Sequence, residues 1–184
     1  MSKQNFLEIM VPIRLDTKWY QGLVKELSVV KSFVEWQREG TIHQTLVFIK
    51  DESLVSKLKR EFRTIRTKIK PITLTIDTLE AFTTGKGDKH VVSLTSSQPP
   101  SGLLELANDA RVCAECLGAN YDKRPFKLHI TLCKIPSDAI ALEDLQSILA
   151  KISLPAFDCR LDDVQYRYQG SEKLIDKWNL EISI

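Results

Sequence analysis

The chain has 184 residues, which is enough for one compact domain with a substantial core or for two tightly joined halves. Its composition, 43% hydrophobic and 27% charged, is ordinary for a globular protein, and a net charge of +2 excludes a general electrostatic affinity for nucleic acid. Glu8 and Pro12 interrupt the apolar stretch 6–13, so we expect no signal peptide or membrane span and predict a cytosolic protein.

Hydrophobic periodicity predicts alternating strands and helices in the first half of the chain. In chain order we expect a strand at 6–13, a helix at 17–39, a strand at 41–49, a helix at 53–68 and neighbouring strands at 72–82 and 90–95. Gly40 and Pro71 end the two helices, and Gly85 and Gly87 form the turn between the last two strands. Serine, proline and glycine then dominate 96–102, which we interpret as a loop and as the boundary between two halves.

The second half repeats the order of elements predicted for the first. We expect a helix at 103–117, a strand at 127–135, a helix at 138–151 and strands near 157–168 and 173–184. In both halves a helix precedes a strand that contains the pattern H-x-T-L, and another helix follows that strand. This order predicts a degenerate internal duplication with a domain-sized period.

Two of the three histidines begin the same four-residue pattern, H-Q-T-L from His43 and H-I-T-L from His129. Alternate residues of a strand point to the same side, so Thr45 and Thr131 each place a hydroxyl beside an imidazole. Two imidazoles at one site can act as base and acid, and the hydroxyls can donate to an anion between them. Lys127 precedes His129 by two residues, so it lies on the same face of the predicted strand. It is either a phosphate contact or a lysine at the rim of the site.

These paired motifs resemble those of the 2H phosphoesterase superfamily, which includes 2′-5′ RNA ligase-like and 2′,3′-cyclic phosphodiesterase proteins. Residues 124–134, R-P-F-K-L-H-I-T-L-C-K, are similar to the family pattern R-P-F-x-P-H-h-T-L-x-R, in which h is hydrophobic. Leu128 stands where proline is usual in that pattern, and Lys134 stands where arginine is usual. Residues 43–50 keep the H-x-T-L-x-F core of the first motif, with Lys50 in place of the glycine often found there.

The resemblance implies an α+β fold of two lobes, each a small antiparallel sheet with flanking helices, with the two motif strands side by side under a cleft. The whole chain, 1–184, would form one bilobal domain whose internal pseudo-repeat divides near 96–102. Residue by residue, the resemblance assigns catalysis to His43 and His129 and phosphate contact to Thr45 and Thr131. The implied partner is a nucleotide or RNA terminus with a 2′,3′-cyclic phosphate or a 2′-5′ linkage, and we expect a monomer that binds no membrane.

Hydrolysis of a cyclic phosphate needs a water deprotonated, a ribose oxygen protonated and the growing phosphorane charge stabilised. Two histidines in opposite protonation states, with the nearby donors, supply all three, so we expect neither a metal nor another cofactor. The resemblance implies a 2′-phosphate product, and the residues leave open which histidine is the base. In the reverse direction of this reaction, the same groups would perform 2′-5′ RNA ligation. The competing class is a non-catalytic nucleotide- or RNA-binding module, suggested by the departures at Lys50 and Leu128.

Other candidate residues have simpler interpretations. His90 lacks the motif context, so we expect it to be structural. Cys113 and Cys116 have a C-x-x-C spacing that suits zinc or redox chemistry, but they fall in a predicted helix without a second such pair. The basic segment 57–70 could follow an RNA backbone, and we favour a solvated helix face instead. Aromatic residues that could stack on a nucleobase are Tyr121, Phe126, Tyr166, Tyr168 and Trp178.

Overall fold

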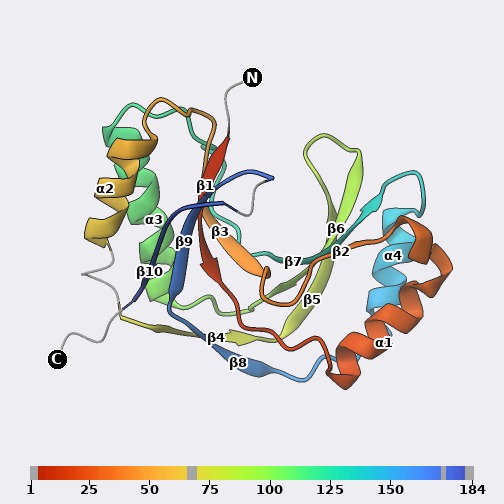
Figure 1. The fold of residues 1–184 in the computed structure, drawn as a ribbon. Coiled ribbons are helices and arrows are strands. Elements are labelled where there is room, and N and C mark those ends of the chain that lie inside the picture. Colours follow the sequence, from red (N-terminus) through yellow and green to blue (C-terminus); the bar gives the residue numbers. More distant parts are fainter. Residues whose placement is uncertain (1–3, 66–69, 171–172, 181–184) are drawn as a thin grey trace.

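The computed structural model describes residues 4–65, 70–170 and 173–180, which form two four-stranded antiparallel sheets and one two-stranded sheet (Figure 1). The first sheet has the order β10-β9-β1-β3, the second β2-β7-β6-β5 and the small sheet β4-β8. The strands are β1 (Asn5–Met10), β2 (Glu35–Trp36), β3 (His43–Ile49), β4 (Ile72–Ile76), β5 (Thr78–Thr83), β6 (Lys89–Thr95), β7 (Ile130–Pro136), β8 (Phe157–Leu161), β9 (Asp163–Tyr168) and β10 (Leu174–Asn179). The predicted α+β fold with two small antiparallel sheets is confirmed.

Helices flank the two larger sheets on their outer sides (Figure 1). They are α1 (Lys18–Glu26), the 3-10 helix η1 (Leu27–Phe33), α2 (Val55–Ile65), α3 (Ser101–Cys116) and α4 (Leu142–Leu149). Helix α3 packs against β3 and α2, and α4 packs against β5. No helix in the described part of the chain is long and apolar enough to cross a membrane.

The helix predicted for 17–39 is wrong beyond Glu26. The chain tightens there into η1, in which Val30 has non-helical dihedral angles, and β2 then pairs with β7. Valine and phenylalanine recur from 29 to 34, and such side chains favour extended backbone because a helix restricts their χ1 rotamers. The second sheet thereby gains an edge strand that periodicity did not predict.

The segment 72–82 divides between two sheets at Asp77. β4 pairs with β8 in the small sheet, whereas β5 pairs with β6, as the prediction of neighbouring strands required. The carboxylate of Asp77 accepts hydrogen bonds from the hydroxyl of Thr78 at 2.8 Å and from the backbone N–H of Ser97 at 2.9 Å. These bonds stabilise a local turn, which redirects the chain from one sheet to the next.

Each large sheet takes strands from both sides of the segment 96–102. The first combines β1 and β3 with β9 and β10, and the second combines β2, β5 and β6 with β7. The two lobes are therefore interleaved along the sequence rather than successive. A repeat boundary near 96–102 stays a prediction about the sequence duplication.

The two faces of the first sheet differ in what they contact. Leu7, Ile9 and Tyr166 are buried on the helix side, where the ring of Phe62 meets that of Tyr166 edge-on with centroids 5.2 Å apart. By alternation, Glu8 and His43 lie on the opposite face. The core thus fixes which side chains of β1, β3 and β9 face away from α2 and α3.

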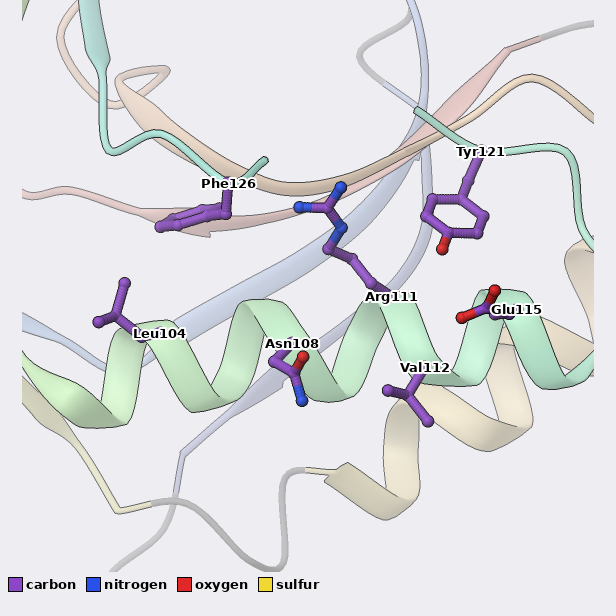
Figure 2. A pocket seen from close by; sticks show the side chains of 7 residues that line it. All are labelled: Leu104, Asn108, Arg111, Val112, Glu115, Tyr121 and Phe126. Atoms are coloured by element: carbon purple, nitrogen blue, oxygen red, sulfur yellow. The ribbon is translucent and has the colours of Figure 1, made fainter. Parts of the chain in front are cut away.

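A cavity of about 430 Å³ lies between α3 and the segment that follows it (Figure 2). It is lined by Leu104, Asn108, Arg111, Val112, Glu115, Tyr121 and Phe126. The rings of Tyr121 and Phe126 lie across from the helix in this view. Neither motif histidine contributes to its wall.

Candidate active site

The first motif lies at the start of β3, an edge strand of the first sheet. His43 and Thr45 are half-buried and alternate with the buried Gln44 and Leu46, as the strand prediction required. The Nδ1 atom of His43 lies 2.8 Å from the carbonyl oxygen of Thr41. Because a carbonyl only accepts, Nδ1 carries a proton, and Nε2 is the nitrogen left for proton exchange.

The second motif begins immediately before β7 rather than within it. The strand starts at Ile130, so the predicted strand 127–135 begins three residues too early. His129 is half-buried, and its Nδ1 lies 2.9 Å from the carbonyl oxygen of Lys127. Both histidines thus donate from Nδ1 to the carbonyl two residues earlier, which leaves each Nε2 to work as acid or base.

Gln44 joins the two motifs, although its position between His43 and Thr45 gave no sign of this role. Its Oε1 atom accepts a hydrogen bond from the backbone N–H of His129 at 2.8 Å. Its Nε2 atom donates to the carbonyl oxygen of Thr45 at 2.7 Å and lies 3.5 Å from that of Lys127. With 1% of its surface exposed, Gln44 fixes the backbone of the second motif against the first.

The surroundings of His43 lower its affinity for a proton. Burial lowers the pKa of His43, opposed by its hydrogen bond to Thr41 and reinforced by the charges of Arg167, His129 and Lys134. A positive charge on His129 therefore disfavours a second positive charge on His43.

The two threonines occupy matching places beside the histidines. Thr45 lies opposite Glu8 in the β1–β3 ladder, and Thr131 lies opposite Ser93 in the β6–β7 ladder. Both side chains are half-buried, and within the described residues neither hydroxyl is hydrogen-bonded. Each hydroxyl can therefore donate to a bound anion without first breaking a protein contact.

Lys127 and His129 both precede β7, so the predicted strand does not reach them, although both side chains contact the ring of Phe82. The Nζ atom of Lys127 lies 2.9 Å from Oε1 of Glu80 and 4.5 Å from the ring centroid of Phe82. The same ring meets His129 edge-on, with centroids 5.6 Å apart. The lysine is thus beside the site and half exposed, with a carboxylate partner that an anionic ligand would have to displace or share.

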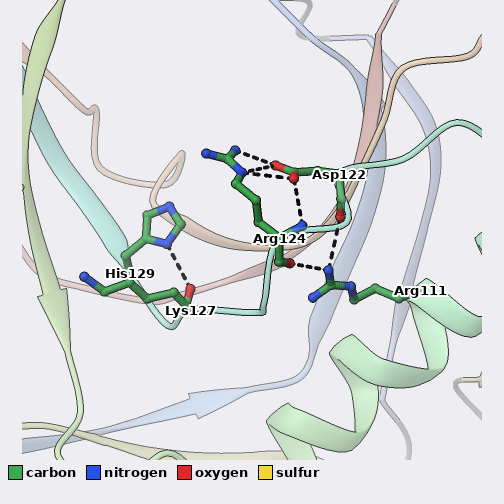
Figure 3. A network of polar contacts seen from close by, with 5 residues as sticks. All are labelled: Arg111, Asp122, Arg124, Lys127 and His129. Atoms are coloured by element: carbon green, nitrogen blue, oxygen red, sulfur yellow. Dashed lines mark hydrogen bonds and ion pairs between the residues drawn. The ribbon is translucent and has the colours of Figure 1, made fainter. Parts of the chain in front are cut away.

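A network of polar contacts holds the segment that leads into His129 (Figure 3). Arg111, on α3, donates to the carbonyl oxygens of Asp122, at 3.1 Å, and Arg124. The guanidinium of Arg124 in turn contacts both carboxylate oxygens of Asp122 at 3.0 Å and lowers the pKa of that carboxyl to about 2. The sequence pattern had singled out Arg124 only as part of the family resemblance and gave no role to Arg111 or Asp122.

The remaining candidates fall mostly in structural positions. His90 is buried, with Nδ1 3.0 Å from the hydroxyl of Thr83 and Nε2 3.0 Å from the carbonyl of Ile140, as a structural histidine should be. Among the aromatic candidates, Tyr121, Tyr166 and Trp178 are buried. Cys113 and Cys116 lie on α3 and are not in a disulfide, and the described residues contain no cluster of three or more metal-ligating side chains.

The basic helix α2 covers the face of the first sheet opposite His43. Arg60 pairs with Glu61 at 3.2 Å, and Arg63 binds Asp176 of β10 through two hydrogen bonds. Arg66 and Lys68 lie outside the described residues. This placement agrees with a solvated helix face, and the alternative of an RNA track would require RNA to pass behind the sheet.

Comparison with known proteins decides the family. The profile of the 2′-5′ RNA ligase superfamily matches residues 37–171, more than half of the chain and both histidine motifs. The chain belongs to this superfamily. It is 33% identical over 101 residues to the RNA 2′,3′-cyclic phosphodiesterase of Escherichia coli K12, an alignment that covers 55% of each protein. The match therefore spans about half the length of that curated relative.

Solved structures of the superfamily fold cover nearly the whole chain. Escherichia coli LigT, solved with 3′-AMP, aligns with a TM-score of 0.64 at 20% identity and covers 98% of this chain and 99% of its own. Usb1 of Kluyveromyces marxianus, solved with uridine monophosphate, aligns with a TM-score of 0.61 at 15% identity over 96% and 98%. At these identities the likeness shows the fold alone.

Proposed function

We propose that this chain is a phosphoesterase that hydrolyses a 2′,3′-cyclic phosphate or a 2′-5′ phosphodiester in a nucleotide or RNA end. The observation that carries the proposal is the junction of the two H-x-T segments through Gln44. Each segment carries an imidazole with the same Nδ1 contact and a hydroxyl without a protein partner among the described residues, which supports one site built from both. Membership of the superfamily supports the reaction class.

In the proposed reaction, His43 and His129 act in opposite protonation states. The neutral histidine removes a proton from a water molecule while the oxygen of that water attacks phosphorus. The imidazolium protonates the departing ribose oxygen. Thr45 and Thr131 donate to the equatorial phosphate oxygens, whose charge grows in the transition state. Lys127 adds a positive charge once the phosphate competes with Glu80 for its ammonium.

This chemistry needs no metal, because imidazoles move the protons and the hydroxyls and Lys127 stabilise the charge. We propose a metal-independent enzyme that works as a cytosolic monomer, and sedimentation at about the chain mass of 21.0 kDa would check the oligomeric state. The 2′-phosphate product implied by family resemblance is part of the same proposal. A chemical shift of the product phosphate in ³¹P spectra would distinguish it from a 3′-phosphate.

The test measures hydrolysis of a 2′,3′-cyclic mononucleotide and of a 2′-5′-linked dinucleotide with a chelator present. The parent is compared with His43→Ala and His129→Ala, and His90→Gln is the matched control outside the site. Each motif variant should lose about 10²–10⁴-fold in kcat, the usual contribution of a general acid or base. A parent inactive on both substrates, or activity that survives loss of both histidines, contradicts the proposal.

The alternatives produce different results in the same samples. RNA halves that carry a cyclic phosphate and a 5′-hydroxyl would yield a joined product if the reverse reaction, ligation, is favoured. Calorimetry that shows nucleotide binding without product would identify a binding module. Hydrolysis is the first activity to assay, because the 33% identical relative is an RNA 2′,3′-cyclic phosphodiesterase.

A further inference from the structure

A buried carboxylate faces His43 from the neighbouring strand. Glu8 of β1 is fully buried, and its Oε2 lies 3.2 Å from Nε2 of His43. Its Oε1 lies 2.6 Å from Nε of Arg167, a residue of β9 whose side chain is 18% exposed. Gln165 accepts a hydrogen bond from the same guanidinium at 2.5 Å and so orients it toward Glu8.

Burial of this carboxylate is costly, and the core gives no reason for it. Leu7 and Ile9 already fill the helix side of β1, and an apolar residue at position 8 would pack beside His43 without losing hydration of a charge. Within the described residues, neither oxygen of Glu8 has a partner with full hydrogen-bond geometry. A poorly compensated charge beside a reactive histidine is typical of a functional group.

The contact places one proton between Glu8 and His43. Because Nδ1 of His43 already donates to Thr41, only Nε2 can exchange with the carboxylate. Either Glu8 is a carboxylic acid beside a neutral Nε2, or Glu8 is a carboxylate beside an imidazolium whose Nε2 carries the proton. Both arrangements contain the same single proton, and they differ only in which atom holds it.

Burial disfavours an unpaired charge on either member of this pair. Burial raises the pKa of Glu8 to about 7, with Arg167 acting in the opposite direction and Asp163 in the same direction. Burial lowers the pKa of His43, and the charges of Arg167, His129 and Lys134 add to that effect. Because each group is costly to charge alone and the two lie 3.2 Å apart, they share one proton as a pair, in which each charge favours the other.

We propose that Glu8 is a positioning residue that keeps a proton at Nε2 of His43, which makes His43 the acid and His129 the base. The inference rests on the proposed two-histidine reaction. His129 takes a proton from water while the hydroxide oxygen bonds to phosphorus, and the bond from phosphorus to the ribose oxygen breaks. His43 gives its Nε2 proton to that oxygen. Solvent then removes the proton from His129 and returns one to His43, whose cation Glu8 stabilises.

The direct test is an NMR titration of the free protein, which contains only three histidines. Glu8→Gln removes the negative charge, so the midpoint of His43 should fall by about one unit or more, a tenfold loss of proton affinity. Arg167→Gln removes the positive charge behind Glu8, so the same midpoint should rise. The resonance of His90, held by Thr83 and Ile140, is the internal control.

Opposite shifts in the two variants support the role of Glu8, because a merely structural residue would not produce them. No shift of the His43 midpoint, or shifts of the same sign, overturns it. If Glu8→Gln does not fold, Glu8→Asp, which shortens the side chain and moves the carboxylate away from Nε2, should lower the His43 midpoint by a smaller amount, and an unchanged midpoint overturns the proposal. These titrations need no turnover, so their outcome is distinct from loss of the proposed activity, which His43→Ala tests.

The pH profile of kcat/KM tests the assignment of roles. An acid that holds its proton less tightly loses activity at lower pH, so Glu8→Gln should move the alkaline limb down by about the same unit and leave the acidic limb in place. Movement of the acidic limb instead would identify His43 as the base and overturn the proposal.

Discussion

Gln44 shows how one buried amide can align two halves of a site. Its two polar atoms contact three backbone groups from both motifs. His129 needs this contact because its N–H precedes β7 and has no partner in the β6–β7 ladder, which begins at Ile130. The orientation of the second imidazole therefore depends on a side chain of the first motif.

Replacement of Gln44 by methionine should test this dependence. The variant keeps the length and volume of the side chain but leaves the N–H of His129 without its partner, so the free energy of unfolding should fall by about 1–3 kcal/mol. Urea denaturation would measure it. Gln146→Met is the control, because its bond to Ala81 is long, at 3.4 Å, and should cost less. Equal losses in the two variants would contradict the special role of Gln44.

Glu8 should give the stability of the protein a distinct dependence on pH. Burial raises its pKa from 4.5 to about 7, so its contribution to stability is present below about pH 4.5 and is lost as the pH rises through about 7. Between about pH 5 and 8, the parent should lose about 1–3 kcal/mol relative to Glu8→Gln, since His43 and Arg167 share the charge. Urea denaturation at several pH values would show this trend, and a constant difference would refute it.

The segment 119–128 is an irregular element fixed from two sides. On one side, the N–H of Asp122 donates to the carbonyl of Phe48 in β3 at 2.9 Å. On the other, Arg111 reaches from α3 to the carbonyls of Asp122 and Arg124 (Figure 3). Since the segment ends at His129, its rigidity bears directly on the second histidine.

Replacement of Arg111 by methionine should loosen this segment without unfolding the sheets. The variant keeps much of the apolar stem but loses both hydrogen bonds, so the amide of Asp122 should exchange about tenfold faster or more. Hydrogen exchange would measure it, with amides of β1 as the internal reference. Arg160→Met, which removes only an exposed pair with Asp162, should leave the Asp122 amide unchanged. Unaltered exchange in Arg111→Met would show that segment 119–128 keeps its structure without the hydrogen bonds of Arg111.

A feature of this structure can be predicted from the sequence when the residues that cause it are close along the chain. The alternation of His43 and Thr45 and the burial of their neighbours follow from the strand itself. The contact from Gln44 to His129 joins residues 85 positions apart, and alternation alone cannot place it. Glu8 likewise looked like an interruption of an apolar strand, and only the packing of β9 across it shows a buried charge.

The same limit applies to the topology. Local patterns predicted most of the helices and strands, but not that β4 leaves the hairpin for β8 or that β2 joins β7. Those strand pairings depend on which sheet edges are still unpaired after the chain has crossed from one lobe to the other. The helix predicted for 17–39 is longer than α1, because the apolar spacing continues into η1 whereas regular helical dihedral angles do not.

The interleaved lobes should unfold together. Each large sheet contains strands from both halves of the chain, and one contiguous core cluster includes residues from both sheets, so neither lobe can lose its structure alone.

Two tryptophans report on different sheets, Trp178 on β10 and Trp36 on β2. Fluorescence during urea unfolding should give the same midpoint for Trp19→Phe/Trp36→Phe, which keeps only Trp178, and for Trp19→Phe/Trp178→Phe, which keeps only Trp36. Each midpoint is compared with that of far-UV circular dichroism on the same variant. If either fluorescence transition departs from its circular dichroism transition, the lobes are separate folding units despite their shared strands.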